Sequence, residues 1–149
     1  MVPETIEIHK KFNKTVNLAV SGGRETTQMG PSQVANKDLA SALQASIEKC
    51  GLFSRVISSG KADYRLDLRL VQLHQPVFGY TDFTCEADIE WRIRHLQSDK
   101  LVWEKIISGH YTATVGDAFA PMTRLKLANE GAIRESIKAG LEQISGLSL

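Results

Sequence analysis

The sequence predicts an α+β fold in which two helices cover one face of a mostly antiparallel sheet. Between residues 62 and 115, apolar and polar side chains alternate through three long runs, as they do in strands with one buried face. Two other segments, residues 32–50 and 121–144, repeat apolar residues at three- or four-residue spacing, as helices do. The order is strand, helix, four strands and helix, which fits a two-layer sandwich with both helices on one face.

The chain divides into a short arm and one domain. Residues 1–13 have mixed polarity and include Lys10 and Lys11, so we expect an extended arm or tether there. Residues 14–149 are expected to form a single domain. A chain of 149 residues buries about two-thirds of its unfolded surface on folding, which is enough for one core.

The first part of the domain is predicted to be a strand followed by a helix. Val16, Leu18 and Val20 alternate with other residues in a strand over residues 15–21. A glycine-containing loop follows, and Ser32 is placed to cap the helix. Gly51 is expected to end that helix in a left-handed conformation. The apolar stripe of the helix is Leu39, Leu43 and Ile47.

The next four strands and the last helix follow from the same patterns. A strand over residues 52–59 leads into the three long runs, with hairpin loops at residues 76–80 and 98–100. Charges on the polar face are expected to pair across strands and fix the register. In the last run Leu101 and Trp103 are expected to share the inward face, and Ile106 breaks the alternation, which predicts a bulge at residues 104–107. Pro121 is expected to begin the final helix, whose apolar stripe is Ile133, Ile137, Leu141 and Ile144.

Composition excludes several classes of function. The chain has 18 basic and 17 acidic side chains for a net charge of +1, so it has no overall field to attract nucleic acid. No apolar run approaches the roughly 20 residues of a membrane helix. No signal peptide is visible, because Met1 is followed by neither a basic start nor an apolar stretch. Either the chain is cytoplasmic, or it is the mature part of an exported precursor.

The motifs of catalysis, cofactor binding and metal binding are missing from the sequence. The loop at residues 21–30 lies where phosphate-binding loops occur but lacks their glycine and lysine spacing, so an ordinary connection is favoured. The four histidines do not share a close metal-ligand spacing. Glu86, Asp88 and Glu90 lie among arginines, which favours a solvated ionic lattice over acid–base catalysis. We therefore expect a non-enzymatic protein without cofactor or metal.

Two cysteines leave the redox state open. Cys50 and Cys85 are expected to face the same core, so they are either two buried thiols or one disulfide. Buried thiols are favoured, because free cysteine is among the residue types most often buried.

Exposed apolar residues in the loops are the candidate contacts with partners. Two aromatic residues lie at the tip of the first long hairpin, where burial within the domain is not assured. The glycine-containing loop and the segment before the last helix raise the same possibility, because long loops often serve binding. The candidate contacts are Phe78, Tyr80, Val77, Arg24, Met29 and Phe119.

Three segments carry a resemblance to a known group of proteins. Residues 36–43 (NKDLASAL), 50–56 (CGLFSRV) and 62–66 (ADYRL) are similar to bacterial envelope lipoproteins, among them the ABC-transport auxiliary lipoproteins and small outer-membrane assembly lipoproteins. The resemblance implies a periplasmic domain anchored to the outer membrane by a lipid on a cysteine before residue 1, with residues 1–13 as the tether. It also implies a binding or scaffolding role in envelope transport or surface assembly. The implied partners are envelope protein subunits, the membrane through the lipid anchor, and other copies of the chain, but not nucleic acid.

The alternative is a cytoplasmic small-molecule binder or enzyme with a pocket between the helices and the sheet. Such a pocket needs convergent polar groups on the inward faces. Cys85, His95 and Tyr64 are the nearest candidates for those groups.

Overall fold

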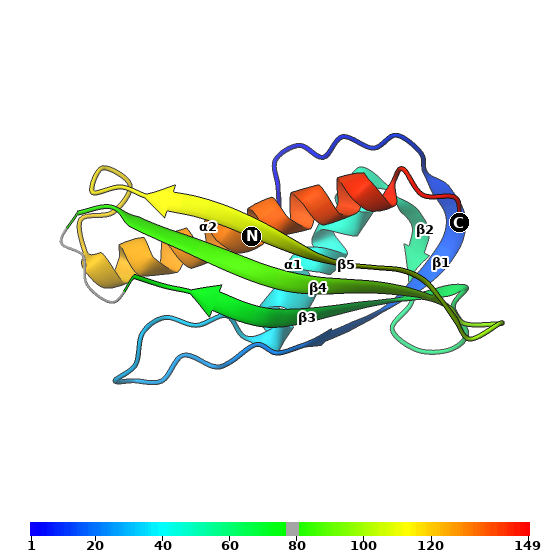
Figure 1. Ribbon diagram of the computed structural model, residues 1–149, viewed down its shortest axis with the longest axis horizontal. Coiled ribbons are helices and arrows are strands. Elements are labelled where there is room, and N and C mark those ends of the chain that lie inside the picture. The colour runs from blue at the N-terminus through cyan, green and yellow to red at the C-terminus, as the bar shows by residue number, and fades with distance from the viewer. Residues whose placement is uncertain (77–80) are drawn as a thin grey trace.

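The computed structural model describes residues 1–76 and 81–149 as a five-stranded sheet with two helices on one face (Figure 1). This is the two-layer α+β fold that the sequence predicts, and in Figure 1 both helices lie behind the sheet. Its elements are β1 (Phe12–Ser21), α1 (Asn36–Cys50), β2 (Phe53–Val56), β3 (Tyr64–His74), β4 (Phe83–His95), β5 (Lys100–Ala113) and α2 (Pro121–Ile144).

The strand order is β2-β1-β3-β4-β5, and the sheet is mixed. The predicted meander is confirmed, since β3 pairs antiparallel with β4, and β4 with β5. The strand β1 lies between β2 and β3 and runs parallel to both. The connection from β1 to β2 passes through α1, as parallel neighbours require a crossover.

The predicted bulge in β5 lies earlier in the strand than expected. Ile93 of β4 pairs with Trp103 and Arg94 pairs with Leu101, so Val102 is the extra residue. Leu101 and Trp103 therefore lie on opposite faces, and the expectation that they share a face is wrong. Ile106 pairs with the outward Glu90 and simply points to solvent, with 56% of its surface exposed. An apolar residue on the outer face interrupts the apolar–polar alternation without any bulge at that position.

Three element boundaries differ from their predictions. The strand β1 begins at Phe12 rather than residue 15, β2 covers only Phe53–Val56, and α1 begins at Asn36 after Ala35. Ser32 therefore does not cap α1 and is instead buried. Gly51 has a φ of 66° and donates its N–H to the carbonyl of Ile47, which confirms the predicted end of α1.

The helix α2 lies unusually close to the sheet at three glycines. A Cβ atom at Gly140 would overlap the ring of Trp91, and one at Gly131 would overlap the ring of Tyr111. From the sheet side, a Cβ at Gly109 of β5 would overlap the backbone of α2 at Ala132. The predicted stripe of α2 is fully buried at all four positions. Helix and sheet thus meet through apolar side chains that fit around these glycines.

Residues 1–11 form an extended segment that lies along the helix layer (Figure 1). Lys49 at the end of α1 donates a hydrogen bond of 2.9 Å to the Pro3 carbonyl. The N–H of Glu7 donates to the Glu142 carboxylate, and the N–H of His9 donates to the Ser145 hydroxyl. Val2, Ile6 and Ile8 pack against the core. This N-terminal strap (residues 1–11) is two residues shorter than the expected arm, because Phe12 already belongs to β1, and its role as a tether stays a prediction.

Neither described helix has both the length and the apolar character needed to cross a membrane.

Candidate functional site

Three connections lie together at one end of the sheet, which we call the loop end. They are residues 22–35 between β1 and α1, the described residues 75–76 and 81–82 between β3 and β4, and residues 114–120 between β5 and α2. The strands β1, β3 and β5 all run in the same direction, so their carboxyl ends lie at the same end of the sheet. Figure 1 shows this loop end at the left.

The predicted partner contacts all come from these three connections. Met29 is 98% exposed and Phe119 is 90% exposed, and the Arg24 side chain is also exposed. Val77, Phe78 and Tyr80 lie outside the described residues. Met122, which follows Phe119 closely and lies in the first turn of α2, is 58% exposed. The loop end therefore presents separate apolar side chains to solvent.

A buried amide network holds the first connection against α2. The carbonyl of Ser32 accepts hydrogen bonds from the amide nitrogens of Gln75, at 2.6 Å, and Asn129, at 2.9 Å. The Gln75 amide also donates to the Asn129 side-chain oxygen at 3.0 Å. Buried polar groups with satisfied partners fix a single arrangement. The network explains why Ser32 is buried although it does not cap the helix.

Arg124 ties the other two connections to α2. Its side chain is 2% exposed, and the guanidinium donates to the carbonyls of Thr81 and Phe119. The guanidinium also lies over the Phe83 ring, with its central carbon 5.1 Å from the ring centroid. A cation above an aromatic face is attracted by the ring's negative charge. Arg124 therefore holds the backbone of the exposed Phe119 and of Thr81 at the start of α2.

A groove of about 690 Å³ runs beside the loop end on the helix side. Its walls come from the first connection, the first turns of α1, α2 and Met1. The charged residues among those that line it are Glu25, Lys37, Asp38, Lys126 and Glu130. Because charges of both signs line it, the groove has no clear preference for an anionic or a cationic ligand.

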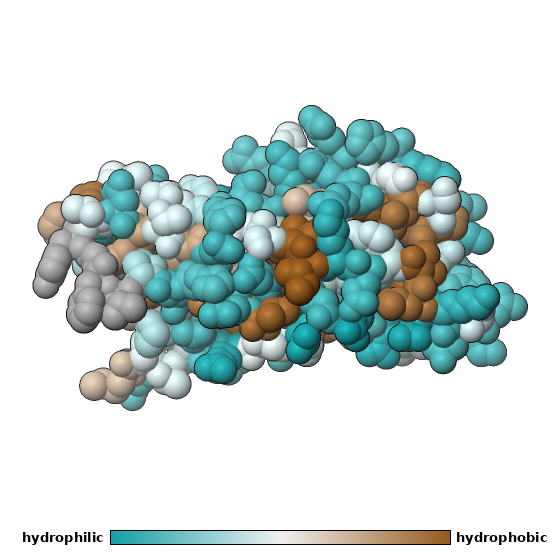
Figure 2. All heavy atoms as spheres, in the orientation of Figure 1, coloured by the Kyte–Doolittle hydropathy of each residue, from teal (hydrophilic) through white to brown (hydrophobic). Residues whose placement is uncertain are grey.

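The outer face of the sheet is the predicted ionic lattice. The carboxylate of Glu90 lies 2.9 Å from both Arg69 and Arg92, and Arg92 also contacts Glu104 at 2.8 Å. The hydrogen bond from Arg69 is the main cause that lowers the pKa of Glu90. Figure 2 shows a largely hydrophilic surface with separate apolar patches. Glu90 itself is largely buried, but its arginine partners are exposed, and ion pairs with exposed partners contribute little to stability and keep this face hydrated.

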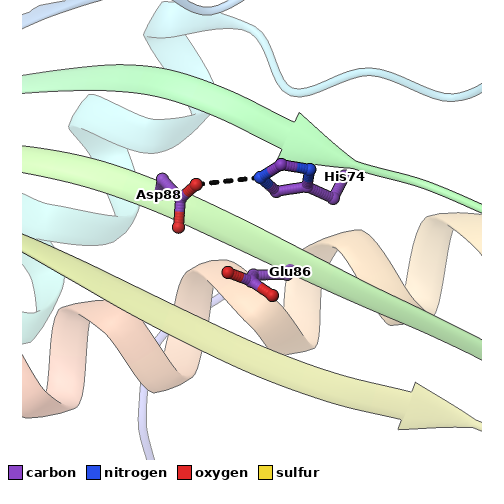
Figure 3. A group of neighbouring side chains, drawn as sticks. All are labelled: His74, Glu86 and Asp88. Carbon is purple, nitrogen blue, oxygen red and sulfur yellow. Dashed lines mark hydrogen bonds and ion pairs between the residues drawn. The ribbon is translucent and has the colours of Figure 1, made fainter.

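At the loop end of this outer face, His74, Glu86 and Asp88 lie together (Figure 3). His74 and Asp88 are joined at 2.9 Å, and potential ligand atoms of all three residues lie within 4.8 Å of one another. Spacing along the chain conceals this group, because His74 ends β3 whereas the carboxylates belong to β4. The sequence shows the alternation that places Glu86 and Asp88 on one face, but the register of the structure is what places His74 opposite Glu86.

The residues of the alternative pocket are part of the core or of a turn. Cys85 is completely buried and Tyr64 is 7% exposed. His95 contacts the Tyr64 ring and the Ser98 hydroxyl in the turn before β5. Cys50 and Cys85 are both free thiols. Burial raises the pKa of Cys50, and it raises the pKa of Cys85 to about 11, so neither thiol is activated as a nucleophile.

Comparison with known proteins finds similarity in structure rather than in sequence. A scan against protein-family models found no match, and a search of curated proteins found no significant one. A solved DUF330-family protein of Xanthomonas campestris has a TM-score of 0.74 at 13% identity, covering 98% of this chain and 93% of that one. A minor lipoprotein of Acinetobacter baumannii has a TM-score of 0.55 at 12% identity, covering 89% of this chain and 93% of that one. The fold is one that bacterial lipoproteins adopt.

One structural neighbour is an oligomer. PelC of Paraburkholderia phytofirmans, solved as a dodecamer, has a TM-score of 0.52 at 11% identity, covering 90% of this chain and 91% of that one. The fold is therefore compatible with self-association. At identities of 11–13%, these similarities show a shared fold and nothing more specific.

Proposed function

We propose that this chain is the folded domain of a bacterial envelope lipoprotein, located in the periplasm and anchored to the outer membrane. It acts by binding envelope protein subunits in a transport or surface-assembly system rather than by catalysis. The fold shared with bacterial lipoproteins and the three sequence segments that resemble them support the envelope assignment. The raised pKa of both thiols, of which Cys85 is completely buried and Cys50 partly so, supports a role without nucleophilic chemistry.

The observation that carries the binding role is the exposure of Met29, Phe119 and Met122 on a firmly held loop end. Removing large apolar side chains from water lowers the free energy, so their burial in an interface would favour binding. The hydrogen bonds of Gln75, Asn129 and Arg124 hold the loops beside these residues. A surface ordered before binding loses less conformational entropy when a partner covers it.

The experiment that tests the binding role compares double variants at the loop end with a double variant of exposed apolar residues on the sheet. In vivo cross-linking with the full-length protein, followed by mass spectrometry, would measure the captured envelope subunits. Met29→Ser with Phe119→Ser should reduce capture at least tenfold, and Phe78→Ser with Tyr80→Ser should do the same if the hairpin tip contributes. Val71→Ser with Ile106→Ser, which changes exposed apolar residues of β3 and β5, is the control. Equal capture by the loop-end and control variants would refute binding at this end.

The lipid anchor requires a separate test. Mass spectrometry of the protein expressed from its full native reading frame should find a cleaved amino-terminal cysteine that carries two or three acyl chains. An unprocessed, unacylated chain in the cytoplasm would remove the envelope assignment whatever the loop end binds.

The exposed edge strand supports self-association. The edge strand β5 has 14 residues, whereas β2 at the opposite edge has four. Leu101 and Val102 are exposed on β5, and a long edge of this kind can pair with another chain. Light scattering should show an oligomer that Val102→Lys dissociates, and a monomer at all concentrations would argue against this part of the proposal.

A further inference from the structure

We propose that His74, Glu86 and Asp88 form a binding site for one divalent transition-metal ion, with Zn²⁺ as the best match. The site lies on the outer face of the sheet beside the loop end (Figure 3). It is distinct from the apolar residues that carry the proposed binding of protein subunits.

The geometry brings one imidazole and two carboxylates onto the same face. His74 lies directly opposite Glu86 in the β3–β4 register, and Asp88 lies two residues further along β4. The Nε2 atom of His74 is 2.9 Å from Oδ2 of Asp88. Two ligand atoms that each lie about 2.0–2.1 Å from one zinc ion are separated by about 3 Å or slightly more. The two atoms therefore already have nearly the separation that a shared ion requires.

Glu86 can complete the set with a small side-chain movement. Its carboxylate lies within 4.8 Å of both other ligand atoms, and its side chain is only half-buried. A set of one imidazole nitrogen and carboxylate oxygens is typical of zinc, which binds nitrogen and oxygen ligands together. Water would fill the remaining positions on the exposed side.

Residues of the neighbouring strand β5 contact both carboxylates from the same face of the sheet. The Ser108 hydroxyl donates a hydrogen bond to Oδ1 of Asp88, which leaves Oδ2 facing His74. His110, which pairs with Glu86 across β4 and β5, places its Nδ1 atom 3.3 Å from Oε2 of Glu86. Metal ligands are commonly oriented by such outer contacts, and their loss weakens metal binding by about 10- to 100-fold.

The charge balance also separates this group from the ionic lattice. Among the described residues, the carboxylates of Glu90 and Glu104 on this face form ion pairs with arginine. The ion pairs found for Glu86 and Asp88 are instead with the imidazoles of His74 and His110. Neither carboxylate is paired with an arginine or a lysine in the part of the chain that the structure describes, and a divalent cation would supply a positive partner for both.

Isothermal titration of the tag-free, EDTA-treated protein with Zn²⁺ tests the proposal. We expect one ion per chain. His74→Ala and Asp88→Asn should each weaken binding at least tenfold, and Ser108→Ala should weaken it about tenfold through the orientation of Asp88. The control is His95→Ala, which removes a histidine that contacts Ser98 at the other end of β4 and should leave the affinity unchanged.

A crystal grown with Zn²⁺ would locate the ion by anomalous scattering, with the expected peak between His74 and Asp88. Circular dichroism establishes that each variant is folded. The proposal is overturned if the wild type binds no stoichiometric zinc, if the His74 and Asp88 variants bind as tightly as the wild type, or if the anomalous peak lies elsewhere. None of these outcomes depends on whether the loop end binds protein subunits.

Discussion

Glycines on both layers set the distance between α2 and the sheet. Gly131 and Gly140 lie on the buried side of α2, against the rings of Tyr111 and Trp91, and Gly109 of β5 lies against the helix backbone. A glycine inside a helix normally costs about 1 kcal/mol relative to alanine. Here that cost is offset by the close contact of a large buried ring with the helix.

The first prediction is that Gly140→Ala destabilises the domain although alanine is the better helix former. The new methyl group would overlap the completely buried Trp91 ring, and overpacking of this kind costs about 1–3 kcal/mol. Urea denaturation would measure this loss as a lower free energy of unfolding. Gly116→Ala is the control, because its nearest contact is Thr114 at 3.5 Å. A stabilised Gly140 variant would show that helix propensity outweighs packing here.

The second prediction concerns the two thiols. A thiol reagent at pH 8 should modify Cys85 only after unfolding, because the side chain is completely buried and its pKa is raised to about 11. Cys50 is partly exposed and should react in the folded protein. The Cys50→Ser variant isolates Cys85 for this comparison. Reaction of Cys85 in the folded variant, or no free thiol in the unreduced, denatured wild type, would contradict the structure.

At the scale of elements, segments far apart in sequence support one another. The N-terminal strap contacts the ends of both helices through Lys49, Glu142 and Ser145. The first turns of α2 hold all three loop-end connections through Arg124 and Asn129. The loops that carry the candidate contacts are therefore positioned mainly by α2.

The third prediction is that the N-terminal strap contributes to stability. Ile6→Ser with Ile8→Ser removes two partly buried side chains from the core surface and should cost about 2 kcal/mol. Chemical denaturation would measure the loss. Glu4→Ser with Thr5→Ser, at exposed positions of the same segment, is the control. Equal stability of both variants would mean that the segment is not held against the helices in solution.

At the scale of the whole molecule, acidic and basic side chains gather and pair on the outer face of the sheet. Basic and acidic side chains nearly cancel in number, yet the outer sheet face gathers several of both kinds. Several carboxylates are held in the charged form by hydrogen bonds. The Thr15 N–H and hydroxyl lower the pKa of Asp63, the Ser108 hydroxyl that of Asp88, and the Thr114 N–H and hydroxyl that of Asp117.

The fourth prediction is that the domain loses stability in acid. Because these folded-state pKa values are lower, the unfolded chain binds more protons near its own carboxyl pKa of about 4, so stability is full above that pH and falls below it. Thermal unfolding should show an almost constant Tm from pH 7 to 5 and a decline below about pH 4. Asp63→Asn with Asp117→Asn should have a shallower decline. An unchanged Tm down to pH 2.5 would contradict this account.

Periodicity determined much of the fold, because it reports which side of an element meets the core. The apolar stripes of α1 and α2, which begin at Leu39 and Ile133, are buried as their spacing predicts. Periodicity cannot distinguish an exposed apolar residue from an irregular strand. The exposed Ile106 therefore predicts a bulge at residues 104–107, whereas the bulge lies at Val102. Nor does local sequence reveal that Ser32 is held by Gln75 and Asn129 rather than capping α1.

The sequence by itself determined the two layers, the antiparallel meander, the charged outer face and the exposed loop residues Met29 and Phe119. Each of these depends on the local pattern of side chains along one element. The tertiary structure decided the parallel place of β1, the position of the N-terminal strap and the grouping of His74 with Glu86 and Asp88. These depend on contacts between distant segments, which strand order and register create and which no local pattern records.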